Sequence, residues 1–215
     1  MSIITQDSPV LWTAGDLVER LGAIPLSRVR MEPSPGSATE RDVTEIHDRE
    51  NRLYELLDGT LLEKTVGNYE SYLAGILIRL LGNFVQQNDL GIVMPPDGMM
   101  RLAPGLVRLP DVSFISWRQL PERRIPHKEI WDLAPDLAVE VISRGNTRQE
   151  MTRKLADYFS AGVRLVWYVY PATCEVEVYE AADKCVKLAA QDTLDGGQVL
   201  PGFRLPLSTL FAQPQ

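Results

Sequence analysis

Residues 137–142 read Leu-Ala-Val-Glu-Val-Ile, an apolar run of strand length that contains a single carboxylate, Glu140. A run this apolar predicts a strand that is buried on both faces. Burial of an ionised carboxylate is costly unless the group is paired or binds a cation. Glu140 therefore predicts a positively charged partner inside the fold.

A second acid, Asp111, lies at the start of another apolar run that extends to Ser116. Two acids on buried strands invite one shared partner, and a divalent metal is the simplest choice. Mg²⁺ takes carboxylate oxygens and keeps several waters, and a metal held in this way can generate hydroxide and bind a phosphate. The pair therefore predicts a Mg²⁺ site, with Mn²⁺ as a substitute, that hydrolyses phosphodiesters.

Lys154 follows Glu140 by fourteen residues and falls on a predicted helix. It would supply positive charge near the negative charge that develops during hydrolysis. Each residue has a structural alternative when it is taken alone. Pro-Asp is a common turn opener, which would explain Asp111, and Lys154 could pair on the helix surface with Glu150.

The composition predicts one domain of ordinary size with an N-terminal extension. The chain has 215 residues, of which 45% are hydrophobic, so it can form a substantial core. We place the extension at residues 1–50 and the domain at residues 51–215. No apolar run is long enough to span a membrane and the first residues do not resemble a signal peptide, so a cytoplasmic location is expected. The two cysteines, Cys174 and Cys185, predict neither a disulfide framework nor a zinc site.

The net charge of −7 argues against a protein that coats nucleic acid without specificity. The charge is uneven, however. Residues 101–165 hold eleven Lys and Arg against eight Asp and Glu, so the basic share lies where the two special acids are. Solvated loop faces would give the same local surplus.

The order of predicted elements indicates an α/β fold with a mixed sheet flanked by helices. Asp58-Gly59 between two short apolar runs predicts a hairpin, residues 118–131 an exposed loop, and residues 175–179 an edge strand. Helices are expected at residues 13–21, 69–87 and 149–161, and strands at residues 53–57, 60–64, 91–94, 99–103, 109–116, 137–142, 163–170 and 175–179.

Several short motifs in this order resemble the PD-(D/E)XK nuclease superfamily and, within it, the Uma-two family of restriction-endonuclease-like proteins. The stretches that carry the resemblance are Tyr-Glu-Leu-Leu-Asp-Gly at 54–59, Pro-Asp-Val-Ser-Phe-Ile-Ser at 110–116, Ala-Pro-Asp-Leu-Ala-Val-Glu-Val-Ile-Ser at 134–143, Lys-Leu-Ala-Asp-Tyr at 154–158 and Ala-Gly-Val-Arg at 161–164. The resemblance covers roughly residues 50 to 212 and implies a restriction-endonuclease-like fold with an N-terminal arm.

One position departs from the superfamily pattern. The signature would place a lysine two residues after Glu140, where this chain has Ile142. Residues two apart share a face of a strand, so a lysine there would point at the same metal. The resemblance implies that the lysine has moved to the following helix, where Lys154 is available.

The resemblance also suggests a further carboxylate at the metal, and Glu55 and Glu70 both fit the family pattern. We expect Asp111, Glu140 and the backbone carbonyl of Val141 to hold the metal, and Lys154 to orient or deprotonate the attacking water or to offset transition-state charge. The backbone of the DNA substrate would be held by Arg123, Arg124 and Lys128.

The function predicted from the sequence is thus metal-dependent endonuclease cleavage of DNA. The alternative is a nucleic-acid-binding or scaffolding protein that keeps the nuclease fold without turnover, which the acidic net charge and the lack of a base-reading motif favour. Glycoside hydrolysis by the same two acids would need an aromatic sugar cleft, which the 7% aromatic content does not suggest. The sequence does not determine the oligomeric state, for which monomer and homodimer both remain open. It also does not determine the DNA sequence preference or the biological pathway.

Overall fold

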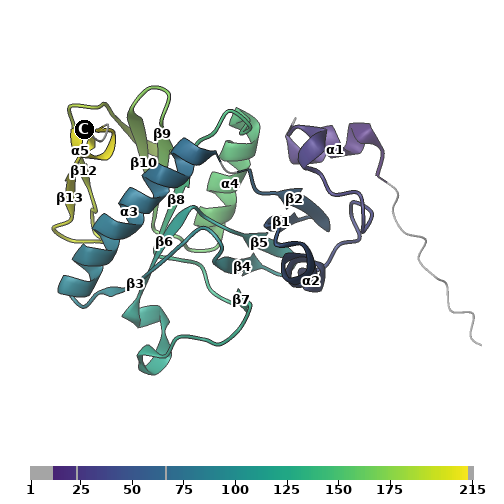
Figure 1. Cartoon of the computed structure of the whole chain (residues 1–215), viewed down its shortest axis with the longest axis horizontal. Coiled ribbons are helices and arrows are strands. Elements are labelled where there is room, and N and C mark those ends of the chain that lie inside the picture. Colours follow the sequence, from purple (N-terminus) through teal and green to yellow (C-terminus); the bar gives the residue numbers. More distant parts are fainter. Residues whose placement is uncertain (1–11, 23, 66, 213–215) are drawn as a thin grey trace, which may run out of the picture.

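The central feature of the protein is a six-stranded mixed sheet, seen in a computed structural model that describes residues 12–22, 24–65 and 67–212 (Figure 1). In spatial order its strands are β11 (Lys184–Leu188), β10 (Glu175–Ala181), β9 (Leu165–Tyr170), β8 (Leu137–Val141), β6 (Val112–Ser116) and β3 (Gly91–Met94). Strands β8 and β9 are parallel, whereas the other neighbouring pairs are antiparallel. The mixed α/β architecture predicted from the sequence is confirmed.

Two helices cover opposite faces of this sheet. Helix α3 (Asn68–Gln87) packs on the face that includes Leu137 and Val139 of β8. Helix α4 (Arg148–Ser160) packs on the face that includes Ala138. Because side chains alternate along a strand, Glu140 points toward α4 rather than toward α3.

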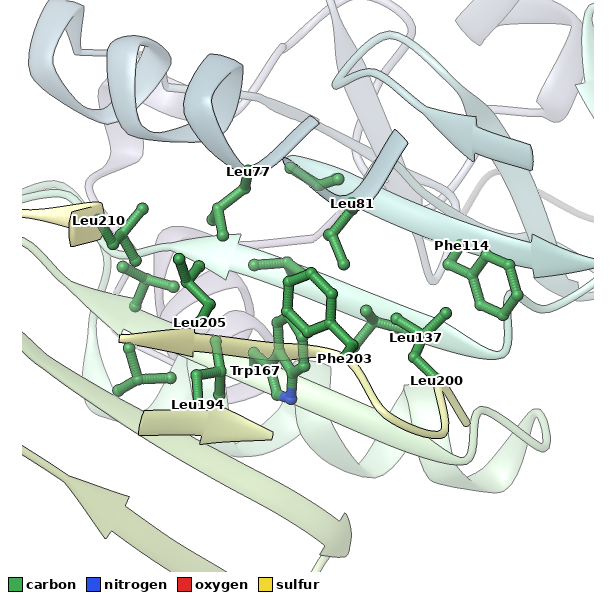
Figure 2. Close-up of a cluster of buried hydrophobic side chains, with 14 of the residues drawn as sticks. Leu77, Leu81, Phe114, Leu137, Trp167, Leu194, Leu200, Phe203, Leu205 and Leu210 are labelled. Carbon is green, nitrogen blue, oxygen red and sulfur yellow. The ribbon is translucent and has the colours of Figure 1, made fainter. Parts of the chain in front are cut away.

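The largest apolar cluster lies between α3 and the sheet (Figure 2). Leu77 and Leu81 of α3 are fully buried over Trp167 of β9. Phe203 closes this cluster, with its ring centroid 5.3 Å from that of Phe84 and 6.0 Å from that of Trp167. It belongs to a C-terminal segment formed by β12 (Thr193–Asp195), β13 (Arg204–Pro206) and α5 (Leu207–Leu210). Leu205, Leu207 and Leu210 of this segment are buried in the same cluster, so the C-terminal segment packs onto the core.

A second, five-stranded sheet lies beside the first. Its spatial order is β2 (Thr60–Glu63), β1 (Tyr54–Leu57), β5 (Leu106–Arg108), β4 (Met99–Ala103) and β7 (Ile130–Trp131). Strands β1 and β2 form the predicted hairpin, with Asp58 at φ 48° and Gly59 at φ 66°. Two positive φ values are what a two-residue hairpin turn requires.

The N-terminal segment wraps around the second sheet. It contains α1 (Ala14–Leu21), a 3-10 turn η1 (Leu26–Arg28) and α2 (Glu40–Glu50). Leu17 and Leu21 of α1 are buried against Leu57 and Leu62 of the hairpin. Helix α2 was not predicted from the sequence, because its apolar signal is limited to two buried side chains; a capping box between Thr39 and Asp42 defines where it begins.

Three sequence predictions are corrected by the structure. Strand β10 is not an edge strand, because β11 pairs with it and forms the edge. The strand predicted at residues 109–116 begins only at Val112, because Pro110 has no N–H to donate and the N–H of Leu109 is directed to Glu55. The loop predicted at residues 118–131 contains two 3-10 turns, η2 (Trp117–Gln119) and η3 (Pro121–Arg123), and strand β7.

Within the described ranges, no helix combines the length and the hydrophobicity that crossing a membrane requires.

Candidate active site

The two acids singled out in the sequence lie side by side where β6 and β8 meet. Strands β6 and β8 pair antiparallel with Val112 opposite Val139, and the N–H of Asp111 donates to the carbonyl of Val139 at 2.9 Å. The carboxylate of Asp111 accepts a hydrogen bond from the N–H of Val141 at 2.7 Å. The side chain of Asp111 is 15% exposed, so this acid sits at the surface end of the site.

Glu140 is buried beneath α4. Its Oε1 lies 3.0 Å from Nζ of Lys154 and accepts a hydrogen bond from the hydroxyl of Tyr158 at 2.5 Å. Lys154 and Tyr158 are four residues apart on α4, so they share one face of that helix. Burial raises the pKa of Glu140 and the charge of Asp111 adds to this effect, while Lys154 opposes it.

Glu55, on β1 of the second sheet, completes the buried cluster. Its Oε1 lies 3.0 Å from Nζ of Lys154, and its Oε2 lies 2.7 Å from the guanidinium of Arg108. Burial alone would raise the pKa of Glu55, but Lys154 and Arg108 outweigh it and hold that pKa well below its usual range. Burial would lower the pKa of Lys154, yet Glu140 and Glu55 raise it above the usual value. Lys154 is therefore a permanent cation that bridges two carboxylates.

Lys64 is a member of the cluster that the sequence analysis missed. Its Nζ lies 2.9 Å from Oδ1 of Asp111, donates to the carbonyl of Leu109 and lies 3.3 Å from the carbonyl oxygen of Pro96. Its side chain is only 6% exposed. Each of the two acids thus has its own lysine.

Arg108 was also missed, although the sequence carried a signal for it. It stands between Val107 and Leu109, and a charge inside an apolar run is the same signal that identified Glu140. It is 1% exposed and also binds Asp157 of α4 at 2.5 Å. Arg108 therefore ties the second sheet to α4 and fixes where Glu55 sits.

Two adjoining cavities open onto the acids. The inner one, about 10 Å³, is lined by Glu55, Glu140 and Lys154 together with Asp111. This is roughly the space of one water molecule. The outer one, about 110 Å³, lies against α3 and is lined by Asp111, Val141 and Glu70, among others. Of the two alternatives for a third acid, Glu55 thus belongs to the buried cluster, and Glu70 lines the mouth.

The predicted DNA-backbone residues are not brought to this cluster. Asp111 precedes β6, whereas Arg123 and Arg124 follow its other end. Arg123 pairs with Asp89 at 2.8 Å, Arg124 pairs with Glu122 at 3.0 Å, and all four side chains are exposed. Lys128 lines a separate cavity of about 280 Å³ beside β4 and β7.

The cluster offers few ligands for a metal, but these are compatible with Mg²⁺. No group of three or more His, Cys, Asp or Glu side chains arranged to hold a metal occurs in the described part of the chain. Mg²⁺ is commonly bound by only one or two carboxylates, with waters and substrate phosphate filling the other positions. Asp111 and Glu140 fit that pattern, and Oε2 of Glu140 accepts no hydrogen bond from the residues that the structure describes. Val141 offers its N–H to Asp111, so a role for its carbonyl remains a prediction.

The chain is similar in fold to a solved nuclease-like structure. A crystal structure from Anabaena variabilis ATCC 29413, described as "a putative nuclease belonging to DUF820", superposes with a TM-score of 0.66 at 16% identity. The match covers 74% of this chain and 89% of that chain. At this identity the similarity concerns the fold alone.

The family comparison covers well over half of the chain. Residues 41–208 match the model of the Uma2 family, described as "Putative restriction endonuclease". None of the curated proteins matches the chain. The matched residues include Asp111, strand β8 with Glu140 and helix α4 with Lys154. The chain belongs to the Uma2 family.

Proposed function

We propose that this protein is a Mg²⁺-dependent endonuclease that hydrolyses phosphodiester bonds in DNA. The observation that carries the proposal is that Asp111, just before β6, Glu140 of β8 and Lys154 of α4 line one small cavity. Membership of the Uma2 family supports it.

Asp111 and Glu140 are the residues that would hold the metal. When bound, Mg²⁺ polarises phosphate oxygens and makes a bound water more acidic. Asp111 is oriented for this role by the N–H of Val141. Glu140 is oriented by Tyr158, which leaves its other oxygen available.

Lys154 acts as a fixed positive charge rather than as a base. Glu140 and Glu55 raise the pKa of Lys154 above its usual value, which favours the protonated form and opposes a role as the base. Of the roles considered for this lysine, orientation of the water and electrostatic stabilisation of the phosphorane-like transition state remain. Lys64, in contact with Asp111, supplies a second positive charge at the same site.

One observation favours the non-catalytic alternative. Every charged group of the cluster already has a partner within the chain, and the inner cavity holds roughly one water. A network that only links the two sheets to α4 would look similar. A measurement of DNA cleavage therefore distinguishes the nuclease from the non-catalytic protein.

The test is cleavage of supercoiled plasmid, single strands and branched duplexes with Mg²⁺ or Mn²⁺, alongside Mn²⁺ binding measured by electron paramagnetic resonance. Asp111→Asn and Glu140→Gln should lose both cleavage and Mn²⁺ binding. Lys154→Met should keep Mn²⁺ binding but cleave about a hundred- to a thousand-fold more slowly. Matched controls are Glu180→Gln and Lys184→Met, an exposed ion pair at the β10–β11 edge, which should behave as wild type.

Absence of metal-dependent cleavage by the wild-type protein on all three substrates would reject the enzyme. Retention of full activity by Asp111→Asn and Glu140→Gln would reject the assigned site, even if the protein cleaves DNA.

A further inference from the structure

A groove leads away from the acids around the carboxyl ends of β8 and β9. The outer cavity at Asp111 shares Glu70 with a cavity of about 480 Å³, which is also lined by Tyr69, Arg144 and Tyr170. That cavity in turn shares Tyr170 and Ile142 with a larger one of about 580 Å³. Three cavities that share walls form one path from the acids across the end of the sheet.

The far cavity is rich in tyrosine. Tyr168 and Tyr170 of β9 and Tyr179 of β10 line it, together with Glu177 and the N-terminal turns of α4. Tyr168 is buried, whereas Tyr170 and Tyr179 are half-buried and present part of each ring to the cavity. Its volume falls within the range typical of small-molecule sites, roughly 300–1,000 Å³.

A carboxylate is fixed inside this cavity. The hydroxyl of Tyr170 donates to Oε2 of Glu177 at 2.8 Å, and the hydroxyl of Tyr179 donates to the same oxygen at 2.7 Å. Oε1 of Glu177 accepts no hydrogen bond from any residue that the structure describes. A held carboxylate with one open oxygen between aromatic rings can accept a hydrogen bond from a flat ligand that carries an amino group.

This cavity lies on the same face of the sheet as Glu140. The strand register places Glu140 beside Tyr168, and Tyr168 beside Glu177. Neighbouring strands are about 4.8 Å apart, so Glu177 lies about two strand spacings from Glu140. That separation, about 9.6 Å, corresponds to about three nucleotide steps at roughly 3.4 Å per nucleotide.

Two arginines line the path without being used by the fold. Arg144 and Arg148 are exposed, and neither forms an ion pair within the described residues. Arginine binds phosphate through its fork of N–H donors. Aromatic rings combined with such cations along a groove are the pattern by which proteins hold single-stranded nucleic acid.

We propose that the tyrosine cavity receives an unpaired, amino-bearing base of single-stranded DNA, with Glu177 accepting from the amino group and Arg144 and Arg148 holding the adjoining phosphates. This inference rests on the proposed nuclease function, because a strand bound in the cavity would continue along the groove and bring a neighbouring phosphate to Asp111. Cytosine suits the cavity better than thymine, since its N4 amino group donates to a carboxylate.

The test is equilibrium binding of fluorescein-labelled octamers, dC8 and dT8, by anisotropy in EDTA. The chelator excludes turnover, so the result does not depend on catalysis. Wild-type protein should bind dC8 more tightly than dT8. Tyr179→Leu should weaken dC8 binding about 5- to 150-fold, the range for loss of one stacked base. Glu177→Gln should reduce the preference for dC8 over dT8.

Matched controls distinguish this surface from the exposed arginines beyond the other end of β6. Arg148→Ala should weaken binding, whereas Arg123→Ala, an exposed arginine beyond the other end of β6, should not. Tyr179→Phe keeps the ring but loses the hydrogen bond to Glu177, so it should retain most of the affinity and lose part of the base preference.

Photo-crosslinking covers the case in which Tyr179→Leu fails to fold, since it uses the wild-type protein. An octamer that carries 5-iodocytosine should crosslink to Tyr170 or Tyr179, as mapped by mass spectrometry. Crosslinks only elsewhere, no crosslink, or equal affinity of wild type and Tyr179→Leu would overturn the proposal. Tyrosine-dependent binding without cleavage would instead keep this site and reject the nuclease, and cleavage that depends on Asp111 but not on Tyr179 would do the reverse.

Discussion

Replacement of Lys154 by methionine should destabilise the protein strongly, and more at neutral pH than at acidic pH. Lys154 is 4% exposed and lies 3.0 Å from both Glu140 and Glu55. Coulomb's law gives about 5 kcal/mol for one such pair at an effective dielectric constant of roughly 20. Part of this offsets the cost of burying the charges, so removal of one partner typically costs about 3–5 kcal/mol. We expect that loss in the free energy of unfolding at pH 7.5.

The pH dependence follows from Glu140. Its pKa in the folded protein is raised by burial, and removal of Lys154 raises it further. A carboxyl whose folded pKa exceeds its unfolded pKa makes the folded state bind more protons between those two values, so stability falls as pH rises through that window. The deficit of Lys154→Met relative to wild type should therefore shrink between pH 7.5 and pH 5.

The assay is urea unfolding followed by tryptophan fluorescence, to which the fully buried Trp167 contributes. A double-mutant cycle with Glu140→Gln isolates the interaction. Because the double variant lacks both partners, it should be more stable than the sum of the two single losses predicts, by about 2–3 kcal/mol. Additive losses, or a deficit that is constant from pH 5 to pH 7.5, would refute the reasoning.

Two further predictions concern the N-terminal arm and the hairpin. Arg28→Met should lower the free energy of unfolding by about 3–5 kcal/mol, because Arg28 forms a buried ion pair with Glu150 of α4 through two hydrogen bonds. Arg30→Met, which removes a half-exposed ion pair, should lower it by less than about 1 kcal/mol. Equal losses of the two variants in urea unfolding would contradict this prediction. Gly59→Ala should lower the Tm more than Gly105→Ala does. Both glycines have positive φ, but only at Gly59 would the new Cβ lie 2.6 Å from a backbone atom. Equal shifts in Tm would contradict this prediction.

The lysine that the superfamily signature places two residues after Glu140 is replaced here by lysines from other elements. Ile142 instead packs in the apolar cluster beside α4. The positive charge arrives from two other elements, Lys154 from α4 and Lys64 from the residue after β2. A lysine side chain is long and flexible, so several backbone positions can deliver its amine to one place.

The prediction of the acids from the sequence had a local physical basis. A charge inside a strand-length apolar run is visible without any knowledge of the fold, and this identified Glu140. The same signal was present at Arg108 and was not used. Lys64 has a weaker signal because it stands at the end of its run, beside the charged residue Glu63.

The sequence by itself determined the elements whose signals are local. The hairpin at Asp58-Gly59, the long apolar helix α3 and the buried strand around Glu140 each depend on turn chemistry or hydrophobic period within a few residues. Weak local signals failed: α2 has two buried side chains, and the strand β11 at the sheet edge has almost no buried side chain.

Only the tertiary structure decided which charges meet. Glu55 lies on β1 of the second sheet and Lys154 lies on helix α4, 99 positions later, yet their charged atoms are 3.0 Å apart. Arg28 of the N-terminal arm pairs with Glu150 of α4, and no sequence pattern near either residue predicts this pairing. Burial creates the need for a partner locally, but the identity of that partner depends on long-range packing, which side-chain periodicity does not encode.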